Sequence, residues 1–470
     1  MAKKTIVWFR NDLRVHDNPT LHDAVSTGDV LPVFVLDSTL LTSSRASSNR
    51  NRFLIESLQD LKKSLQELGS NLVLLENLDE LVDLAKKQSV SSVHYTIDYT
   101  PYARSRDQQM KKRFEDIGID FIGSAGHLIV DSLRGIETKN GKVMKVFTPF
   151  YKQWAQIDRR SVHEKPASLP TIPSNVNVGT IPRIEKLTQK SQLSEDALSG
   201  GESAARTRLT EFLKHDLERY GHGQNDLGDD STSRLSSYLH FGCISSREIE
   251  SKLGNDGPSV AFRRQLCWRD FYHYILLHYP DNTKQEFQPR YHGAKWSVNK
   301  KHLEAWENAQ TGYPIVDSAM TQLLREGWMH NRARLIVGSF LTKDLGIDWR
   351  EGETHFLKWL IDGDMANNNG NWQWIASVGV DPAPVFRRLY NPTLQQQKFD
   401  PNGEYIRRYL PQFKNVPTKH LGEPWSMTDE EQKEFSCIVG KDYPVPIVDH
   451  KEARKAALEW YGSIAANAKD

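Results

Sequence analysis

Short apolar runs alternate with amphipathic helical patterns from the N-terminus to about residue 130, and this alternation limits the possible folds more than any other feature of the chain. The apolar runs have the length and content of buried strands, and they lie at 5–9, 30–37, 71–76 and 92–98. Helical patterns fill the intervals at 52–68, 78–87 and 104–118. Apolar strands joined by helices predict a parallel sheet that is covered on both faces. Such a sheet binds its ligands outside the carboxyl ends of its strands.

A second, helical domain follows after a connector. Residues 161–202 contain four prolines, many serines and little periodicity, as a connector does. Helical patterns then dominate, at 206–221, 259–280, 315–341 and 354–362. We therefore predict a Rossmann-like α/β domain at 1–132, a linker at 133–202 and an all-α domain at 203–470.

The composition excludes several classes of protein. The chain is 38% hydrophobic and 26% charged, as ordinary globular proteins are. No apolar run approaches the roughly 18 residues that a membrane span needs, and Arg10 and Asp12 interrupt the first apolar segment, which is therefore no signal peptide. Three cysteines without a CxxC pair favour neither a disulfide framework nor a metal site, and they predict a reducing, cytoplasmic location. Because GxGxxG and Walker motifs are absent, an ordinary dinucleotide or phosphoryl-transfer site is unsupported.

The stretch IDGDMANNNGNWQW, residues 361–374, has an unusual composition. It places two aspartates and four asparagines beside Trp372 and Trp374. Asn, Gly and Asp suit turns, so a surface loop is one interpretation. The tryptophans favour another, because buried amides and carboxylates need partners. In this second interpretation the stretch is the wall of a site for a polar, aromatic guest.

A second stretch, RRQLCWRDFYHYIL, combines aromatic, amide and basic side chains. Gln265, Trp268 and Tyr272 fall on one helical face, with Arg269 beside them. Proteins stack on a nucleobase, bond its edge and hold its phosphate with such a set. An amphipathic helix with a partly buried Trp explains these residues equally well. Since the net charge is only +1, a nucleic acid would have to bind a local basic patch.

The segment TSRLS, residues 232–236, is rich in hydroxyl groups just before a helical pattern. Hydroxyls and backbone amides at a helix start can hold an anion. They can equally form a helix cap, and the five residues alone favour the cap.

Eight motifs together resemble the class I DNA photolyases of the photolyase/cryptochrome family. They run through nearly the whole chain in the same order: WFRNDLRVHDNP, DYTPYARSRD, TSRLSSYLHFG, RQLCWRDFYHYIL, TGYPIVDSAM, GWMHNRARLIVGSFL, DWREGE and IDGDMANNNGNWQW. The resemblance implies light-driven repair of cyclobutane pyrimidine dimers by an electron from excited, reduced FAD. UV-damaged DNA would be the partner and the protein a monomer. A cryptochrome, which senses blue light without repair, is the alternative, and a Trp-rich binding module without a cofactor is a third hypothesis.

The resemblance also implies roles for individual residues around a U-shaped FAD. Asp362 would pair with Arg334, Asp364 would meet the edge of the flavin ring, and Asn368 would face flavin N5. The full set expected at the cofactor is Tyr220, Thr232, Ser233, Arg234, Leu235, Ser236, Asn331, Arg334, Asp362, Gly363, Asp364 and Asn368.

Electron transfer and DNA binding are assigned by the same resemblance. Trp372, Trp349 and Trp296 match the chain that carries an electron from the surface to the flavin. Trp268 and Trp374 match the aromatics that stack around the flipped pyrimidine pair. The residues expected to contact DNA are Gln265, Trp268, Arg269, Tyr272, Asn331, Arg332 and Trp374.

Several positions depart from the pattern of the family. Gln265 stands where many dimer photolyases have Glu, Gln224 replaces an Arg, and Leu335 replaces a Met. The two catalytic histidines of six-four photolyases would fall at Asn331 and Leu335, so that branch fits poorly. Folate-binding members have a Glu where this chain has Ala103. We therefore favour 8-hydroxy-deazaflavin over methenyltetrahydrofolate as a second, antenna chromophore, and an empty antenna pocket is also possible.

Overall fold

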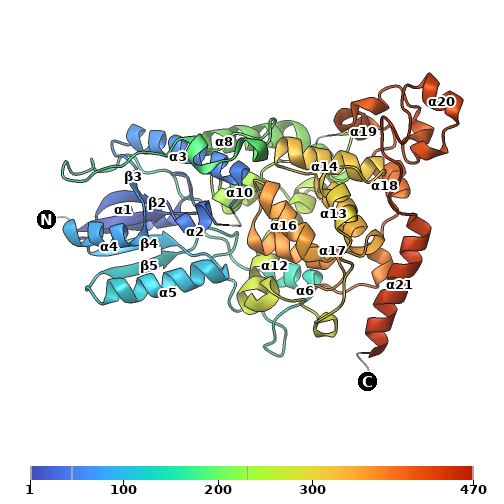
Figure 1. Ribbon diagram of the computed structural model, residues 1–470. Coiled ribbons are helices and arrows are strands. Elements are labelled where there is room, and N and C mark those ends of the chain that lie inside the picture. The colour runs from blue at the N-terminus through green and yellow to red at the C-terminus, as the bar shows by residue number, and fades with distance from the viewer. Residues whose placement is uncertain (1–2, 44–45, 230, 468–470) are drawn as a thin grey trace.

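The computed structural model describes residues 3–43, 46–229 and 231–467. Its N-terminal part is built on a parallel sheet in the strand order β3-β2-β1-β4-β5 (Figure 1). The strands are β1 (Lys4–Phe9), β2 (Asp29–Val35), β3 (Val73–Leu75), β4 (Ser92–Thr96) and β5 (Asp120–Ser124). The predicted parallel sheet is confirmed.

Helices cover both faces of this sheet, and each begins at a side-chain cap that satisfies a free backbone N–H. Asn18, Asp37, Ser47, Asn77 and Thr100 provide these caps. The helices are α1 (Pro19–Thr27), the short α2 (Ser38–Leu41), α3 (Ser48–Glu67), α4 (Leu78–Lys87) and α5 (Pro101–Glu115).

Alternate side chains of β1 enter two different cores. Ile6 and Trp8 join the cluster formed with α4 and α5. Val7 and Phe9 join a larger cluster that includes α1, α3 and part of the helical domain. Because successive side chains of a strand point to opposite faces, burial on both sides explains why the strand is a continuous apolar run.

The connecting segment that follows contains little regular structure. It holds α6 (Phe147–Trp154), α7 (Ile184–Leu187) and the 3₁₀ turn η1 (Lys190–Gln192). Helix α6 contacts α12 of the helical domain. The exact domain boundaries at 132 and 202 stay predictions.

Helices make up the rest of the chain, and α12, α16 and α17 lie at its centre (Figure 1). No helix within the described residues is long and apolar enough to span a bilayer. The main helices are α8 (Glu202–Glu211), α9 (Tyr220–Gly223), α10 (Ser236–Phe241), α11 (Ser246–Ser251), α12 (Gly257–His278), α13 (Lys300–Glu307), α14 (Pro314–Glu326), α15 (Asn331–Ser339), α16 (Trp349–Trp359), α17 (Met365–Ile375), α18 (Pro392–Phe399), α19 (Glu404–Tyr409), α20 (Asp429–Glu434) and α21 (His450–Asn467).

The helical pattern at 315–341 forms two helices instead of one. Helix α14 ends at Gly327, whose φ of 60° is left-handed and suits a residue without a side chain. Helix α15 begins four residues later, capped by the His330 side chain. Asn331, Arg332 and Arg334 therefore lie on a helix of their own, α15, whose direction is independent of α14.

The N-terminal motif WFRNDLRVHDNP joins the two domains. The buried guanidinium of Arg14 donates hydrogen bonds to the backbone carbonyls of Gly242 at 2.9 Å and Gly126 at 3.0 Å. The Glu202 carboxylate accepts the N–H of Val15 at 2.8 Å. This motif therefore fixes how the sheet sits on the helical domain.

A buried lysine makes the stability of the helical domain depend on pH. Lys343 lies in the π-helical turn η6 (Phe340–Asp344), where its ammonium donates to the carbonyl of Ile375. Burial and the neighbouring Arg388 lower the pKa of Lys343 from 10.5 to about 7. Between pH 7 and pH 10.5 the unfolded chain therefore binds one more proton than the folded chain does. The resulting loss of folding stability is complete below pH 7 and disappears as the pH rises toward 10.5.

We expect the wild type to gain stability relative to Lys343→Met between pH 7 and pH 9, by at most ~1.4 kcal/mol per pH unit. Denaturant unfolding of both proteins at several pH values measures this difference. A difference that stays constant with pH would show that Lys343 is charged in the folded protein.

Candidate functional site

Residues 361–374 contribute a buried helix to the centre of the domain. Helix α17 is capped by Asp364, whose carboxylate accepts the N–H of Asn367 at 2.7 Å. A Cβ at Gly370 would lie 2.1 Å from the ring of Tyr272, so glycine is what allows α17 and α12 to pack so closely. The interpretation as a surface loop is wrong.

An ion pair closes one side of a cavity in front of α17. The Arg334 guanidinium donates to Asp362 at 2.8 Å and to the carbonyl of Met329 at 2.9 Å. The second oxygen of Asp362 is buried and has no hydrogen-bond partner among the described residues. Gly363 lies against the guanidinium of Arg50.

Amides form the floor of this cavity. The Asn368 side chain is buried and donates to the carbonyl of Glu353 at 3.0 Å. The cavity measures about 70 Å³, and its polar walls are Asn331, Arg334, Asp362, Asn367, Asn368 and Asn371, with Leu335 and Trp372 among the apolar ones. A buried carboxylate oxygen that still needs a donor, next to amides and an indole, fits the polar edge of a planar heteroaromatic ring such as that of FAD.

Histidines surround Asp364 on the opposite side of the helix start. The nearest oxygen of Asp364 lies 3.4 Å from His273 and 4.0 Å from His240. Burial opposes ionisation, but the field and hydrogen bond of His273 hold the pKa of Asp364 well below its usual range. Burial lowers the pKa of His273, but the charge and the hydrogen bond of Asp364 raise it by more. The pKa of His273 is therefore raised overall.

His127 lies 3.2 Å from His273 and completes a group whose ligand-type atoms are all within 4.8 Å of one another. The Arg269 guanidinium donates to His127 Nε2 at 3.1 Å. A fixed cation at this distance opposes the binding of a metal ion. The carboxylate of Asp364 therefore balances Arg269 and His273.

The TSRLS segment is held in place by side chains of three other segments. Arg208 donates to the carbonyls of Thr232 at 2.8 Å and Ser233 at 3.0 Å. Arg234 pairs with Glu326 at 2.8 Å, and the Ser236 hydroxyl, at the start of α10, accepts the indole N–H of Trp328 at 3.2 Å. Leu235 is buried, and so is Tyr220 at the start of α9, which stands edge-on to Phe262.

The three tryptophans expected to carry electrons, called the tryptophan row below, lie on neighbouring segments. Trp372 and Trp349 are buried and Trp296 is half-buried. A Cβ at Gly352, one turn after Trp349, would lie 2.2 Å from the Trp372 ring. The residue after Trp296 donates its N–H to the carbonyl of Gly346 at 2.8 Å, just before α16. All three indole N–H groups are buried without a hydrogen-bond partner among the described residues.

The residues expected to contact DNA separate into different environments. Gln265 is exposed on α12 and donates to Gln224 at 3.4 Å, so two of the departures from the family pattern contact each other. Trp268 stacks on Phe147 of α6, with centroids 3.7 Å apart, so one face of its ring is already covered. Tyr272 is buried and donates to Asn371 at 3.2 Å.

Of the remaining members of that set, Asn331 is exposed at the start of α15, and the other three are tied to their neighbours. Trp374 has the guanidinium of Arg388 over its ring at 3.7 Å. Arg332 donates to Asn225 at 2.5 Å. Arg269 points inward, toward His127 and the carbonyl of Leu239, and the structure does not place it with Gln265.

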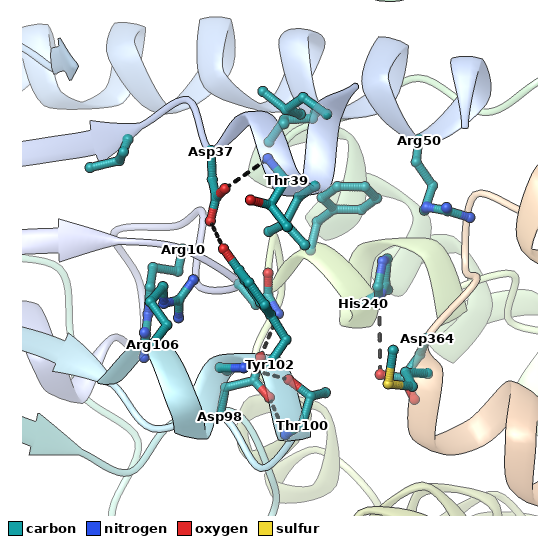
Figure 2. A pocket seen from close by; sticks show the side chains of 18 of the residues that line it. Arg10, Asp37, Thr39, Arg50, Asp98, Thr100, Tyr102, Arg106, His240 and Asp364 are labelled. Carbon is teal, nitrogen blue, oxygen red and sulfur yellow. Dashed lines mark hydrogen bonds and ion pairs between the residues drawn. The ribbon is translucent and has the colours of Figure 1, made fainter. Parts of the chain in front are cut away.

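A larger cavity of about 510 Å³ lies between the two domains (Figure 2). Trp8 and Arg10, at the carboxyl end of β1, and Arg106 and Ala103 of α5 line it on one side. The two guanidinium groups each lie 4.9 Å from the Trp8 ring. The sequence analysis did not assign Trp8, Arg10 or Arg106 to a ligand site, although the sheet rule locates a ligand at this edge. His240 and Asp364 line the far side, so this cavity reaches the first site.

Comparison with known proteins identifies the family. Residues 5–171 match the family model described as DNA photolyase, and residues 262–463 match that of the FAD binding domain of DNA photolyase. The deoxyribodipyrimidine photo-lyase of Streptomyces griseus is 36% identical, over 96% of this chain and 97% of that protein.

Two solved structures are similar over nearly the whole chain. A bacterial class III photolyase from Agrobacterium tumefaciens has a TM-score of 0.92 at 33% identity, with 99% of this chain and 98% of that chain covered. A cryptochrome from Synechocystis has a TM-score of 0.88 at 30% identity, with 98% and 99% covered. The chain therefore belongs to the DNA photolyase/cryptochrome family.

Proposed function

We propose that this protein binds FAD and uses blue light to split cyclobutane pyrimidine dimers in DNA. The observation that carries the proposal is the cavity in front of α17, where the pair of Arg334 and Asp362, the amide of Asn368 and the indole of Trp372 converge. Illuminating the protein with a thymine-dimer oligonucleotide tests it: loss of dimers in light alone supports repair, and their persistence favours a photoreceptor.

When bound, FAD supplies the absorption of light and the one-electron chemistry. Asp362 and Arg334 hold the polar edge of the ring between a hydrogen-bond acceptor and a cation. Asn368 presents an amide where plant cryptochromes have an acid, so the chain offers no ready proton there, which favours an anionic, reduced cofactor. The segment from Thr232 to Ser236, with Tyr220, holds the phosphates; its rigid attachment to Arg208 and Trp328 supports this role.

The tryptophan chain accounts for reduction of the cofactor. Trp372 gives an electron toward the cavity, and Trp349 and Trp296 pass the resulting positive charge outward. Short steps between oxidisable rings replace one long transfer, and the packing of α16 on α17 through Gly352 supports the first of these steps.

Damaged DNA meets the face that carries Gln265, Trp268 and Trp374. Trp268 offers one free face to a flipped base, since Phe147 covers the other. Gln265 bonds the base edge as an amide instead of an acid. The cryptochrome alternative rests on the departures at Gln265, Gln224 and Leu335, and on the similarity to the Synechocystis protein.

The interdomain cavity is suited to an antenna chromophore (Figure 2). Arg10 and Arg106 share one carboxylate partner, Asp107, so positive charge remains beside the Trp8 ring and favours an anionic, fused-ring guest. This agrees with 8-hydroxy-deazaflavin as our first choice and methenyltetrahydrofolate as the second. Titrating each compound against FAD-loaded protein, with energy transfer to the flavin as the signal, distinguishes them. Transfer from neither compound would favour an empty pocket.

We also propose a monomer in a reducing, cytoplasmic environment. All three cysteines, Cys243, Cys267 and Cys437, are free and buried, which agrees with the second point. Light scattering tests the first. Membership of class I stays a prediction, because the similar Agrobacterium structure is described as class III.

The ion pair offers a direct test of the FAD site. Asp362→Asn should weaken FAD binding by about ten- to hundredfold, because a charge-assisted hydrogen bond worth ~1.5–3 kcal/mol is lost beside the half-buried guanidinium of Arg334. Absorbance of FAD released on denaturation, per mole of protein, gives the occupancy at each FAD concentration. Glu459→Gln, an exposed carboxylate on α21, is the control and should bind FAD like the wild type. Equal affinity in Asp362→Asn would remove this pair from the site.

A further inference from the structure

A fourth tryptophan, Trp460, extends the row formed by Trp372, Trp349 and Trp296. Trp460 of α21 packs on Trp296, with ring centroids 4.6 Å apart and planes inclined at 47°. Helix α21 runs along the outer edge of the helical domain (Figure 1), and the residues on both sides of this contact, Glu459 and Lys295, are exposed. Trp460 therefore connects Trp296 to α21 at the outer edge of the domain.

The indole N–H groups of the two rings have different partners. Trp460 donates its N–H to the carbonyl of Lys295 at 3.1 Å. The N–H of Trp296 is buried and has no partner among the described residues. A carbonyl dipole directed at an indole N–H stabilises positive charge on that ring, because the acceptor bonds more strongly to a more acidic donor. A positive charge is thus more stable on Trp460 than on Trp296.

Tyr461 is the competing partner, since its ring lies 6.5 Å from Trp296 and 4.7 Å from Trp460. Its oxidation near neutral pH requires loss of the phenolic proton. The hydroxyl is buried and donates to the carbonyl of Ala376 at 2.6 Å, which is no base. Burial, with Tyr291 nearby, raises the pKa of Tyr461 well above its usual value. Tyr461 therefore fills space in this cluster and does not take the charge.

We propose that Trp460 is the terminal electron donor of the chain, an inference that rests on the electron-transfer role proposed above for Trp296. One electron passes from the Trp460 ring to the oxidised Trp296 ring, which becomes neutral. The N–H bond of Trp460 stays intact because its partner is a carbonyl. An external thiol then returns one electron to Trp460, and two such thiols yield a disulfide and two protons.

Transient absorption and thiol-dependent photoreduction of the FAD-loaded protein test this proposal. In Trp460→Phe the tryptophan radical should decay several-fold faster, because the charge stays one ring closer to the cavity, and the yield of photoreduction should fall several-fold. Tyr461→Phe should behave like the wild type. Trp425→Phe should also behave like the wild type, because Trp425 is a half-buried tryptophan whose ring packs on Tyr313.

Oxidation mapping of the wild type gives an answer that needs no variant. After illumination in air without thiol, peptide mass spectrometry should find oxygen added at Trp460 in preference to Trp296 and Trp425. Unchanged radical decay and yield in folded Trp460→Phe, or oxidation confined to Trp296, would overturn the proposal. Full photoreduction in Trp296→Phe would instead show that the proposed chain itself is wrong.

Discussion

Trp372→Phe is expected to abolish photoreduction of oxidised FAD while leaving repair intact once the cofactor has been reduced chemically. Trp372 is the tryptophan of the row that lines the cavity in front of α17. Phenylalanine keeps most of the ring packing against Phe356 and Gly352 but is far harder to oxidise. Flash photolysis and repair assays on the same sample measure both properties.

Trp306 provides the matched control for this substitution. It is fully buried and lies edge-on to Trp372 with centroids 6.1 Å apart, but its other ring neighbours among the described residues are His355 and Phe356, so no second tryptophan continues from it toward the surface. Trp306→Phe should therefore photoreduce normally. Normal photoreduction in Trp372→Phe would show that electrons enter by another route, and Trp306 would be the next candidate.

Trp268→Ala should remove most of the preference for dimer-containing DNA and leave the salt dependence of binding nearly unchanged. Stacking contributes on the order of 1–3 kcal/mol per base, and flipping costs least at a damaged site. The free face of Trp268 is the part of the ring that acts, since Phe147 stacks on the other. Titrations of damaged and intact DNA at several salt concentrations measure preference and slope separately.

Arg332→Ala is the complementary variant for the charge-dependent part. It should weaken binding of both DNAs and lower the salt slope by about one unit at most. The bond from Arg332 to Asn225 places the effect at or below this limit, because part of the guanidinium is already engaged. Arg388 should not contribute a phosphate contact, since it is buried over Trp374, whereas exposed Arg387 should. If Arg332→Ala lost the preference for damaged DNA while Trp268→Ala kept it, the assignment of damage recognition to Trp268 and of charge-dependent binding to Arg332 would be wrong.

The sequence predicted the sheet well where strands are buried on both faces. The four apolar runs became β1 to β4, but β5 was not predicted. Its residues Asp120, Phe121, Ile122 and Gly123 are partly or fully exposed at the sheet edge, so no continuous apolar run marks it. The single helix expected at 315–341 also broke, because tertiary packing favours the left-handed turn at Gly327.

The motifs indicated the candidate site residues and one of their pairings, but not their other contacts. The pair of Arg334 and Asp362 formed as expected. Nothing in the sequence pattern indicated that Gln265 would meet Gln224, or that Phe147 of the connector would cover Trp268. These contacts join segments far apart in the chain, and local periodicity carries no information about them. Arg269 illustrates the same limit, since it follows Trp268 directly yet turns to the interior.

Repair by the chemically reduced, FAD-loaded protein distinguishes a photolyase from a photoreceptor. A thymine-dimer oligonucleotide and a six-four lesion of the same sequence are each illuminated with blue light, with a dark sample beside them. We predict that thymine dimers disappear in the light only, and that the six-four lesion persists because Asn331 and Leu335 stand where that branch has histidines. Thymine dimers that persist under light, although FAD is bound and reduced, would contradict the account and leave a photoreceptor.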